Sequence, residues 1–156
     1  MNQVPFELKS LKQAVILIGI QASGKSTFCQ RYLSDSFHIY ISLDDVGTRN
    51  RELELLMRCI DSNRSFVIDN TNPEVSDRQR YISLAKQHGY ETVGIFFQSK
   101  VRECIERNEL REMKVPAKAI AATSNKLQLP SYEEGFDLLF FAQINEEGFD
   151  IKQWRK

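Results

Sequence analysis

Eight consecutive residues carry the clearest chemistry in this sequence. The run Gly19-Ile20-Gln21-Ala22-Ser23-Gly24-Lys25-Ser26 fits the pattern G-x-x-x-x-G-K-[ST] in full. In such a loop the glycines let consecutive backbone N–H groups turn toward one anion, the lysine reaches the outer phosphates, and the hydroxyl binds Mg²⁺. The run therefore predicts a loop that binds ATP with Mg²⁺, but it does not separate GTPases, ATPases and kinases. The residues expected to contact the nucleotide are Gly19, Ala22, Ser23, Gly24, Lys25, Ser26 and Thr27.

Two carboxylates follow apolar segments downstream of this loop. Asp44 comes after the segment 38–42, where it could accept the proton of an attacking hydroxyl, as the base of a kinase does; a helix cap is the alternative. Asp69 closes the segment 65–69 and is expected to lie beside Ser26. There it could bind Mg²⁺ directly or through water, although an aspartate in a simple turn would give the same pattern.

Arginines follow both carboxylates and also stand later in the chain. Arg107 and Arg111 lie one helical turn apart at the end of a predicted helix. Such a segment can close over ATP and bring guanidinium charge to the transferring phosphoryl group; cations also favour helix C-termini for simple electrostatic reasons. Two earlier pairs could bind a phosphate of the acceptor or could face solvent: Arg49 with Arg51, and Arg78 with Arg80.

A parallel sheet is the element that would bring these residues together. The segment 14–18 is a continuous apolar run, typical of a strand buried on both faces, and a helix over 25–33 follows the loop. Asn72 and Ser99 are the expected N-caps of two later helices. The alternation predicts an α/β fold, that of a P-loop NTPase with a parallel sheet, helices on both faces and a helical lid. The expected strands are 38–42, 65–69, 92–97 and 136–144, and the expected helices 45–60, 73–88, 101–111 and 116–126.

Composition limits the class of protein. With 156 residues, 42% of them hydrophobic and 27% charged, the chain fits one globular domain over residues 1–156. The 21 basic and 21 acidic residues cancel, so any nucleic-acid partner would be held locally and briefly. Three scattered cysteines favour a reducing cytoplasm, and neither a signal peptide nor an apolar run of about 20 residues is visible. We therefore expect a cytoplasmic protein without a membrane partner.

Two longer runs stand in the same order as in a known family. They are Ile68-Asp69-Asn70-Thr71-Asn72-Pro73 and Pro130-Ser131-Tyr132-Glu133-Glu134-Gly135-Phe136. With the phosphate loop, and with the run from Arg107 to Met113 between them, they closely resemble the kinase module of polynucleotide 5′-hydroxyl kinases. The likeness is greatest to the animal polynucleotide kinase 3′-phosphatases and more distant to the phage enzyme. It extends from about Val15 to Ile144, nearly the whole chain.

This resemblance implies a reaction and roles for several residues. The reaction would be ATP-dependent phosphorylation of the 5′-hydroxyl of DNA or RNA, with the nucleic-acid end as a transient substrate and no protein partner evident. Asp44 would be the general base and Arg111 the lid arginine, supported by Arg107. Residues near the acceptor strand would be Arg51, Thr71 and Arg80. One departure is Leu43, which stands where many relatives have a basic residue just before the base. Another is the lack of room for a phosphatase module, so end-healing by this chain would cover one step, or a separate protein would supply the other.

Other functions remain possible from the sequence. A kinase for a small metabolite or nucleoside would use the same loop, base and lid, and Leu43 and the neutral net charge suit it. A switch protein that binds ATP without transferring phosphate would need neither Asp44 nor the lid arginines. The tail over 148–156 could form a short edge strand or a docking segment.

Overall fold

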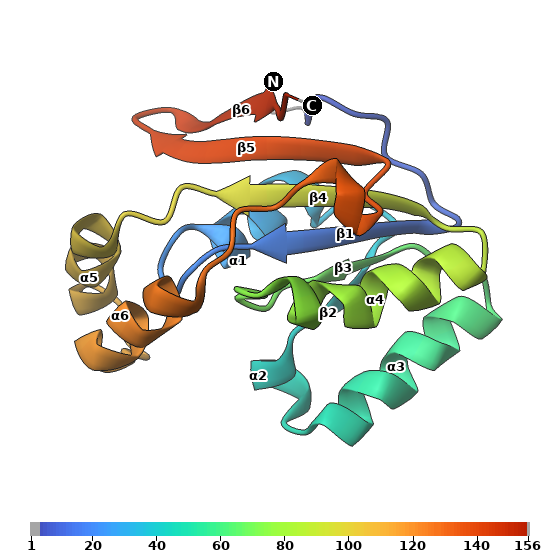
Figure 1. The fold of residues 1–156 in the computed structure, drawn as a ribbon, viewed down its shortest axis with the longest axis horizontal. Helices are drawn as coiled ribbons and strands as arrows, with labels where there is room; N and C mark the ends of the chain where they lie inside the picture. The colour runs from blue at the N-terminus through green and yellow to red at the C-terminus, as the bar shows by residue number, and fades with distance from the viewer. Residues whose placement is uncertain (1–3, 156) are drawn as a thin grey trace.

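The computed structural model describes residues 4–155 and contains one six-stranded sheet with the strand order β2-β3-β1-β4-β5-β6 (Figure 1). The first five strands are parallel, and β6 pairs antiparallel with β5. Their bounds are β1 Gln13–Ile18, β2 Ile39–Ile41, β3 Phe66–Ile68, β4 Glu91–Phe97, β5 Leu138–Asn145 and β6 Gly148–Gln153. All five predicted strands are confirmed, and the C-terminal tail forms an edge strand.

Helices connect the parallel strands, as the alternation predicted. Their bounds are α1 Lys25–Phe28, continued by a π-helical turn over Cys29–Leu33, α2 Leu43–Val46, α3 Arg49–Asp61, α4 Val75–Gln87, α5 Val101–Glu109 and α6 Ala117–Lys126, with a 3₁₀ turn at Tyr132–Glu134. The single helix predicted over 45–60 is wrong. The chain breaks at Gly47, whose φ is 90°, and Thr48 caps α3 by accepting a hydrogen bond from the Arg51 N–H. A short separate helix, α2, therefore carries Asp44 in its first turn.

The N-cap predicted at Asn72 is also wrong. Asn72 adopts a left-handed conformation with φ 47°, and its Nδ2 donates to the Leu17 carbonyl at 2.8 Å, so it ties the loop after β3 to β1. The helix α4 instead begins after Glu74, which exchanges side-chain and backbone hydrogen bonds with Asp77 in a capping box. The consequence is an ordered loop between β3 and α4, at the edge where the site is expected.

The core lies on both faces of the sheet because β1 is buried along its whole length. Ala14, Ile16 and Ile18 pack with residues of α3 and α4 on one face, and Val15 and Leu17 pack with Phe28 and the π-helical turn on the other. Figure 1 shows α3 and α4 together on one side of the sheet. Each fully buried aliphatic side chain contributes about 1.5–3 kcal/mol. This two-sided burial fixes the phosphate loop, which follows β1 directly.

The predicted helical lid is formed by α5 and α6, which lie beside each other beyond the end of β4 (Figure 1). They pack around a small apolar cluster of Ile20, Cys104 and Ile120. The loop between them is fastened by the buried Asn108, whose amide donates to the Val115 carbonyl at 2.6 Å and accepts from the Val115 N–H at 3.1 Å. Between residues 4 and 155, no helix has both the length and the apolar character that a membrane crossing requires.

Candidate active site

A cavity of about 630 Å³ opens where the parallel strands end, between the phosphate loop, α2, the loop after β3 and the lid. Eleven of the residues predicted from the sequence line it: Ala22, Gly24, Lys25, Ser26, Thr27, Asp44, Arg49, Asp69, Thr71, Arg107 and Arg111. Five do not: Gly19, Ser23, Arg51, Arg78 and Arg80. The topology explains the convergence, because parallel strands bring all their carboxyl ends to one edge of the sheet.

The phosphate loop has the backbone conformation that anion binding requires. Ala22 and Gly24 have positive φ angles of 62° and 106°, which turn the chain sharply before α1. A side chain on Gly24 would also meet Ile144 at 3.0 Å, so the end of β5, which also lines the cavity, packs against the loop. The resulting concave turn lines the cavity at the N-terminal end of the helix that starts at Lys25, and it therefore fits the phosphates of a nucleotide.

Two members of the loop support it from outside the cavity. The N–H of Gly19 donates to the Thr71 carbonyl at 3.0 Å, so this amide is already engaged. Ser23 is buried, and its Oγ packs closely against Gly19: a Cβ atom added at Gly19 would lie only 2.6 Å from this oxygen. Ser99, expected as a helix cap, instead accepts from the Ile20 N–H at 3.1 Å and donates to the Phe97 carbonyl at 2.8 Å. The predicted cap is therefore wrong, and Ser99 braces the loop against β4.

Lys25 is buried, with 7% of its surface exposed, and its ammonium group is held by the loop itself. Nζ donates to the carbonyls of Gly19 and Ile20, both at 2.9 Å. Burial lowers the pKa of Lys25 to about 8, and the charge of Asp69 opposes this only in part. A polyphosphate in the cavity would supply the counter-charge that this ammonium group lacks.

Ser26 and Asp69 meet at the floor of the cavity in the way expected for a shared cation. Ser26 Oγ donates to Asp69 Oδ2 at 2.8 Å, and the phenol of Tyr40 donates to the same oxygen. A hydroxyl and a carboxylate facing one space suit Mg²⁺, which prefers oxygen ligands and commonly takes one or two from the protein with the rest from phosphates and water. Within residues 4–155 no group of three or more His, Cys, Asp or Glu residues could hold a metal alone. The pair would therefore hold Mg²⁺ together with the nucleotide.

Asp44 faces the cavity from the other side. It is exposed, lies in the first turn of α2 and lines the cavity opposite the lid. The Leu43 N–H immediately before it donates to Asn70 Oδ1 at 2.9 Å, so the start of α2 is tied to the loop after β3. A carboxylate open to the same space as the phosphate loop could accept a proton from a bound hydroxyl.

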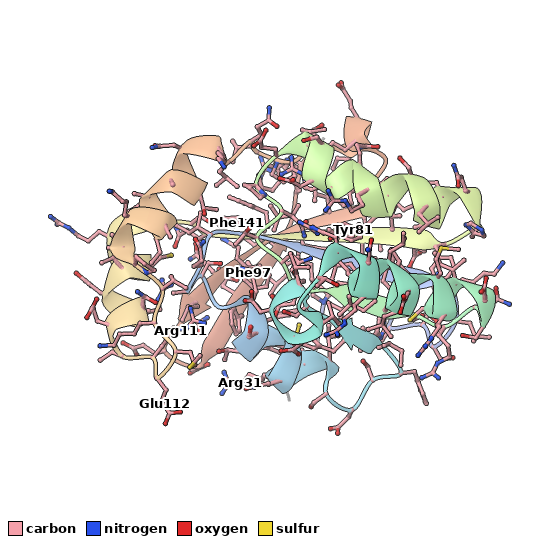
Figure 2. All side chains as sticks on the ribbon, turned by 90° about the horizontal axis from the view of Figure 1, so that it is seen from below. Arg31, Tyr81, Phe97, Arg111, Glu112 and Phe141 are labelled. Carbon is pink, nitrogen blue, oxygen red and sulfur yellow. The ribbon has the colours of Figure 1, made fainter. Side chains whose placement is uncertain are left out.

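The lid brings both predicted arginines to the cavity. Arg107 Nη1 donates to the Ala22 carbonyl at 2.6 Å, and its Nη2 lies 3.6 Å from Glu103 Oε2, so α5 rests on the phosphate loop. Arg111 is exposed, and its positive charge contributes to the lowered pKa of Lys25. Figure 2 shows Arg111 and Glu112 on the loop at the tip of the lid. Of the two, Arg111 has the more freedom to approach a transferring phosphoryl group.

The remaining arginine pairs divide differently from the prediction. Arg78 is fully buried and pairs with Glu134 through Nε at 2.7 Å and Nη2 at 3.0 Å, so it cannot serve as a phosphate ligand. Arg49 lines the cavity, while Arg51 and Arg80 are exposed outside it. Arg49 could therefore bind a phosphate of the acceptor inside the cavity. Arg51 and Arg80 could bind one only outside the cavity, farther from the reacting group.

Family comparison adds a classification to this geometry. Residues 47–130, more than half of the chain, match the model of the AAA domain family AAA_33. The chain belongs to this family. The match begins beyond the phosphate loop, whose identification rests on its own motif and conformation.

Relatives of this AAA domain include two bifunctional proteins. The chain is 31% identical over 134 residues to a putative bifunctional polynucleotide phosphatase/kinase of Acanthamoeba polyphaga mimivirus, covering 81% of this chain and 32% of the relative. It is 26% identical over 136 residues to the bifunctional polynucleotide phosphatase/kinase of Schizosaccharomyces pombe, covering 84% and 33%. The resemblance found in the motifs is thus confirmed, and the chain spans about a third of the length of these relatives.

Solved structures confirm the fold. Kti12 of Chaetomium thermophilum, in complex with ADP-AlF3, superposes with a TM-score of 0.65 at 15% identity, covering 86% of this chain and 92% of that one. A gluconokinase from Sinorhizobium meliloti 1021 gives 0.58 at 14% identity, covering 85% and 84%. The AAA domain therefore has the fold of P-loop kinases, which implies that it binds a nucleotide.

Several residues that contact the cavity lining were not predicted from the sequence as site residues. Tyr40 contacts Asp69, and Glu52 forms a buried network with Tyr81 and Asn70. The sequence pattern could have indicated Glu52, because it lies on the same helical face as Leu56, Cys59 and Ile60, and a charged residue interrupts that apolar face. No sequence pattern indicates the role of Tyr40, because aromatic residues are common on edge strands such as β2.

Proposed function

We propose that the chain is an ATP-dependent kinase that transfers the γ-phosphate to the 5′-hydroxyl of a DNA or RNA strand. The observation that carries this proposal is the meeting of Asp44, the Ser26–Asp69 pair and the lid arginines around one cavity at the phosphate loop. The names of the mimivirus and fission-yeast relatives supply the acceptor class.

In this proposal each cavity residue acts at a defined place. The loop amides and Lys25 bind the phosphates, and Ser26 with Asp69 holds Mg²⁺, which when bound neutralises phosphate charge. Asp44 accepts the proton of the 5′-hydroxyl. The hydroxyl oxygen then bonds to the γ-phosphorus, and the bond between that phosphorus and ADP breaks. Arg111 stabilises the charge of the transferring group.

The position of the exposed arginines suits a strand end. A 5′-terminal hydroxyl belongs to a nucleoside whose first phosphate lies on its far side, so phosphate-binding groups need not line the cavity. Arg51 on α3 and Arg80 on α4 are exposed and do not line the cavity, whereas Thr71 does. In our proposal the terminal nucleoside enters the cavity while the two arginines contact the strand beyond it.

A second candidate is a kinase for a small hydroxylated molecule. It is favoured by the carboxylates Asp44, Glu74 and Asp77, which line the cavity where the acceptor would lie. Carboxylates accept hydrogen bonds from hydroxyl groups and repel phosphates. Only Arg49 adds a positive charge at the α2–α3 side of the cavity lining, and it is paired with Glu52 at 2.9 Å.

The test is transfer from γ-labelled ATP with Mg²⁺ to 5′-hydroxyl DNA and RNA oligonucleotides, to the same strands carrying a 5′-phosphate, and to nucleosides and sugars. Label on the 5′-hydroxyl strands alone supports the proposal, and label on small molecules alone refutes it in favour of the second candidate. Asp44→Asn should lower the rate of transfer by about 10²- to 10⁴-fold, leaving a small measurable rate, and should leave ATP binding intact. Asp45→Asn, the same change on the neighbouring exposed residue, is the matched control.

A further inference from the structure

Glu52 is a carboxylate buried in the core of the domain beside the candidate site. Only 2% of its surface is exposed, and it lies on the face of α3 that packs on the sheet. An ionised carboxylate in such a place is unfavourable unless hydrogen-bond donors surround it. Arg49 Nη1 donates at 2.9 Å, the Tyr81 hydroxyl at 3.0 Å and Asn70 Nδ2 at 2.8 Å. Figure 2 shows Tyr81 on α4, from which it reaches this cluster.

The contact with Asn70 has a consequence for the orientation of its amide group. Both oxygens of Glu52 are acceptors, so Asn70 must turn its NH₂ group toward them. Its Nδ2 also lies 3.0 Å from the Tyr81 hydroxyl. The carbonyl oxygen of Asn70 is thereby left facing the other way, where it accepts from the Leu43 N–H at 2.9 Å. By orienting the Asn70 amide, the buried carboxylate of Glu52 therefore supplies the Leu43 N–H with the acceptor Asn70 Oδ1.

Leu43 begins α2, and this helix depends on outside support. It consists of four residues, Leu43–Val46, and ends at Gly47. A single helical turn is not stable on its own, because its few hydrogen bonds do not offset the entropy of ordering it. The bond from Leu43 to Asn70 joins the first turn of α2 to the loop after β3, which also contributes Asp69 and Thr71 to the cavity. Asp44 is the next residue in that turn.

We propose that Glu52 is a positioning residue for Asp44, acting through the amide of Asn70 and the N–H of Leu43. Glu52 touches no reacting atom; it fixes the turn from which the carboxylate of Asp44 enters the cavity, and it holds Arg49 at the cavity wall. The inference rests on the proposed role of Asp44 as the base. Its first step, the hydrogen bond that joins the Leu43 N–H to Asn70, is a property of the nucleotide-free protein.

The test begins with Glu52→Gln, which keeps the shape and replaces one acceptor oxygen by a donor. Glu54→Gln is the matched control, the same change at an exposed position two residues along α3 and so on the opposite side of the helix. Amide hydrogen exchange by NMR on the nucleotide-free protein should show the Leu43 N–H exchanging at least about fivefold faster in Glu52→Gln, as expected for one lost hydrogen bond. The control should leave it unchanged, and unchanged exchange in Glu52→Gln would overturn the proposal.

The second readout is the transfer reaction, with whichever acceptor the wild-type chain labels. Glu52→Gln should lower kcat by about 10- to 100-fold through misplacement of the base, with ATP affinity unaltered. In an Asp44→Asn background, Glu52→Gln should not lower kcat further, because the base that Glu52 positions has already been removed. An equal loss in both backgrounds would make Glu52 a purely structural residue and refute the proposal.

Folding and function are separated by two further comparisons. If Glu52→Gln does not fold, Asn70→Ala removes the link while leaving Glu52 bonded to Arg49 and Tyr81, and it should reproduce the faster exchange of Leu43. If the wild-type chain labels no acceptor at all, the proposed function fails. The exchange of Leu43 still decides whether Glu52 orders α2, and a normal rate in both variants overturns the inference.

Discussion

The lowered pKa of Lys25 predicts a steep pH dependence of ATP binding. Burial brings this pKa from 10.5 to about 8, so the ammonium group loses its proton as the pH rises through about 8. A bound triphosphate needs that charge and would return the pKa to about its ordinary value. Between pH 7 and 9.5 the charged fraction of the free protein falls about 30-fold, so ATP affinity should fall by the same factor, about 2 kcal/mol.

The assay is a fluorescence or calorimetric titration with ATP at each pH. A terminal phosphate with a second pKa of about 6 is already about 90% ionised at pH 7, so the charge of the nucleotide changes little over this interval. Binding above pH 8 should also take up about one proton, visible as a dependence of the heat on the buffer. Lys25→Met should bind ATP more weakly and with little pH dependence. An affinity of the wild-type chain that stays flat from pH 7 to 9.5 would refute the assignment of a lowered pKa to Lys25.

Three further predictions concern residues around the cavity and the core. Tyr40→Phe removes a donor from Asp69 and should raise the Mg²⁺ concentration needed for half-maximal ATP binding by about 10-fold, whereas an unchanged Mg²⁺ requirement would contradict this role. Burial lowers the pKa of His38 to about 4, so the unfolded chain takes up its proton first and stability is lost as the pH falls from 6.5 toward 4. Urea unfolding should show a loss of about 3 kcal/mol that is absent in His38→Gln. Arg78→Met leaves Glu134 buried and unpaired and should cost about 3–5 kcal/mol of unfolding free energy; a loss below about 1 kcal/mol would mean that the pair contributes little.

The sequence predicted the sheet and the phosphate loop because both depend on local patterns. A strand buried on both faces must be apolar throughout, and the segment 14–18 is, so β1 could be placed from the sequence alone. In the loop that follows, Gly24 has a φ of 106°, a conformation that favours glycine. The pairing of Ser26 with Asp69 followed from the topology, since Asp69 directly follows β3 and Ser26 begins the helix after the loop that follows the neighbouring parallel strand β1.

The errors occurred where distant residues decide a local question. Asn72 has the right chemistry for a helix cap, but the Leu17 carbonyl, far away in the sequence, accepts a hydrogen bond from its amide. Arg78 has the right chemistry for a phosphate ligand, but Glu134 and three backbone carbonyls surround it in the core. In both cases a polar side chain is satisfied inside the fold, and a sequence pattern does not reveal whether a buried partner exists.

The two halves of the cavity differ in how far sequence can explain them. The nucleotide half uses backbone amides and a lysine at fixed spacing, and one anion imposes the same geometry on every such loop. In our proposals the acceptor half consists of side chains of α2, α3 and the loop after β3, and Glu52 positions α2 through its bond to Asn70. The phosphate loop follows β1 and is held by Ser99 after β4 and by the hydrogen bond from the Gly19 N–H to the Thr71 carbonyl, so it shares the loop after β3 with the acceptor half. On our proposal for Glu52, acceptor choice should respond first to mutation of the Glu52 network, because Ser99 still braces the phosphate loop against β4.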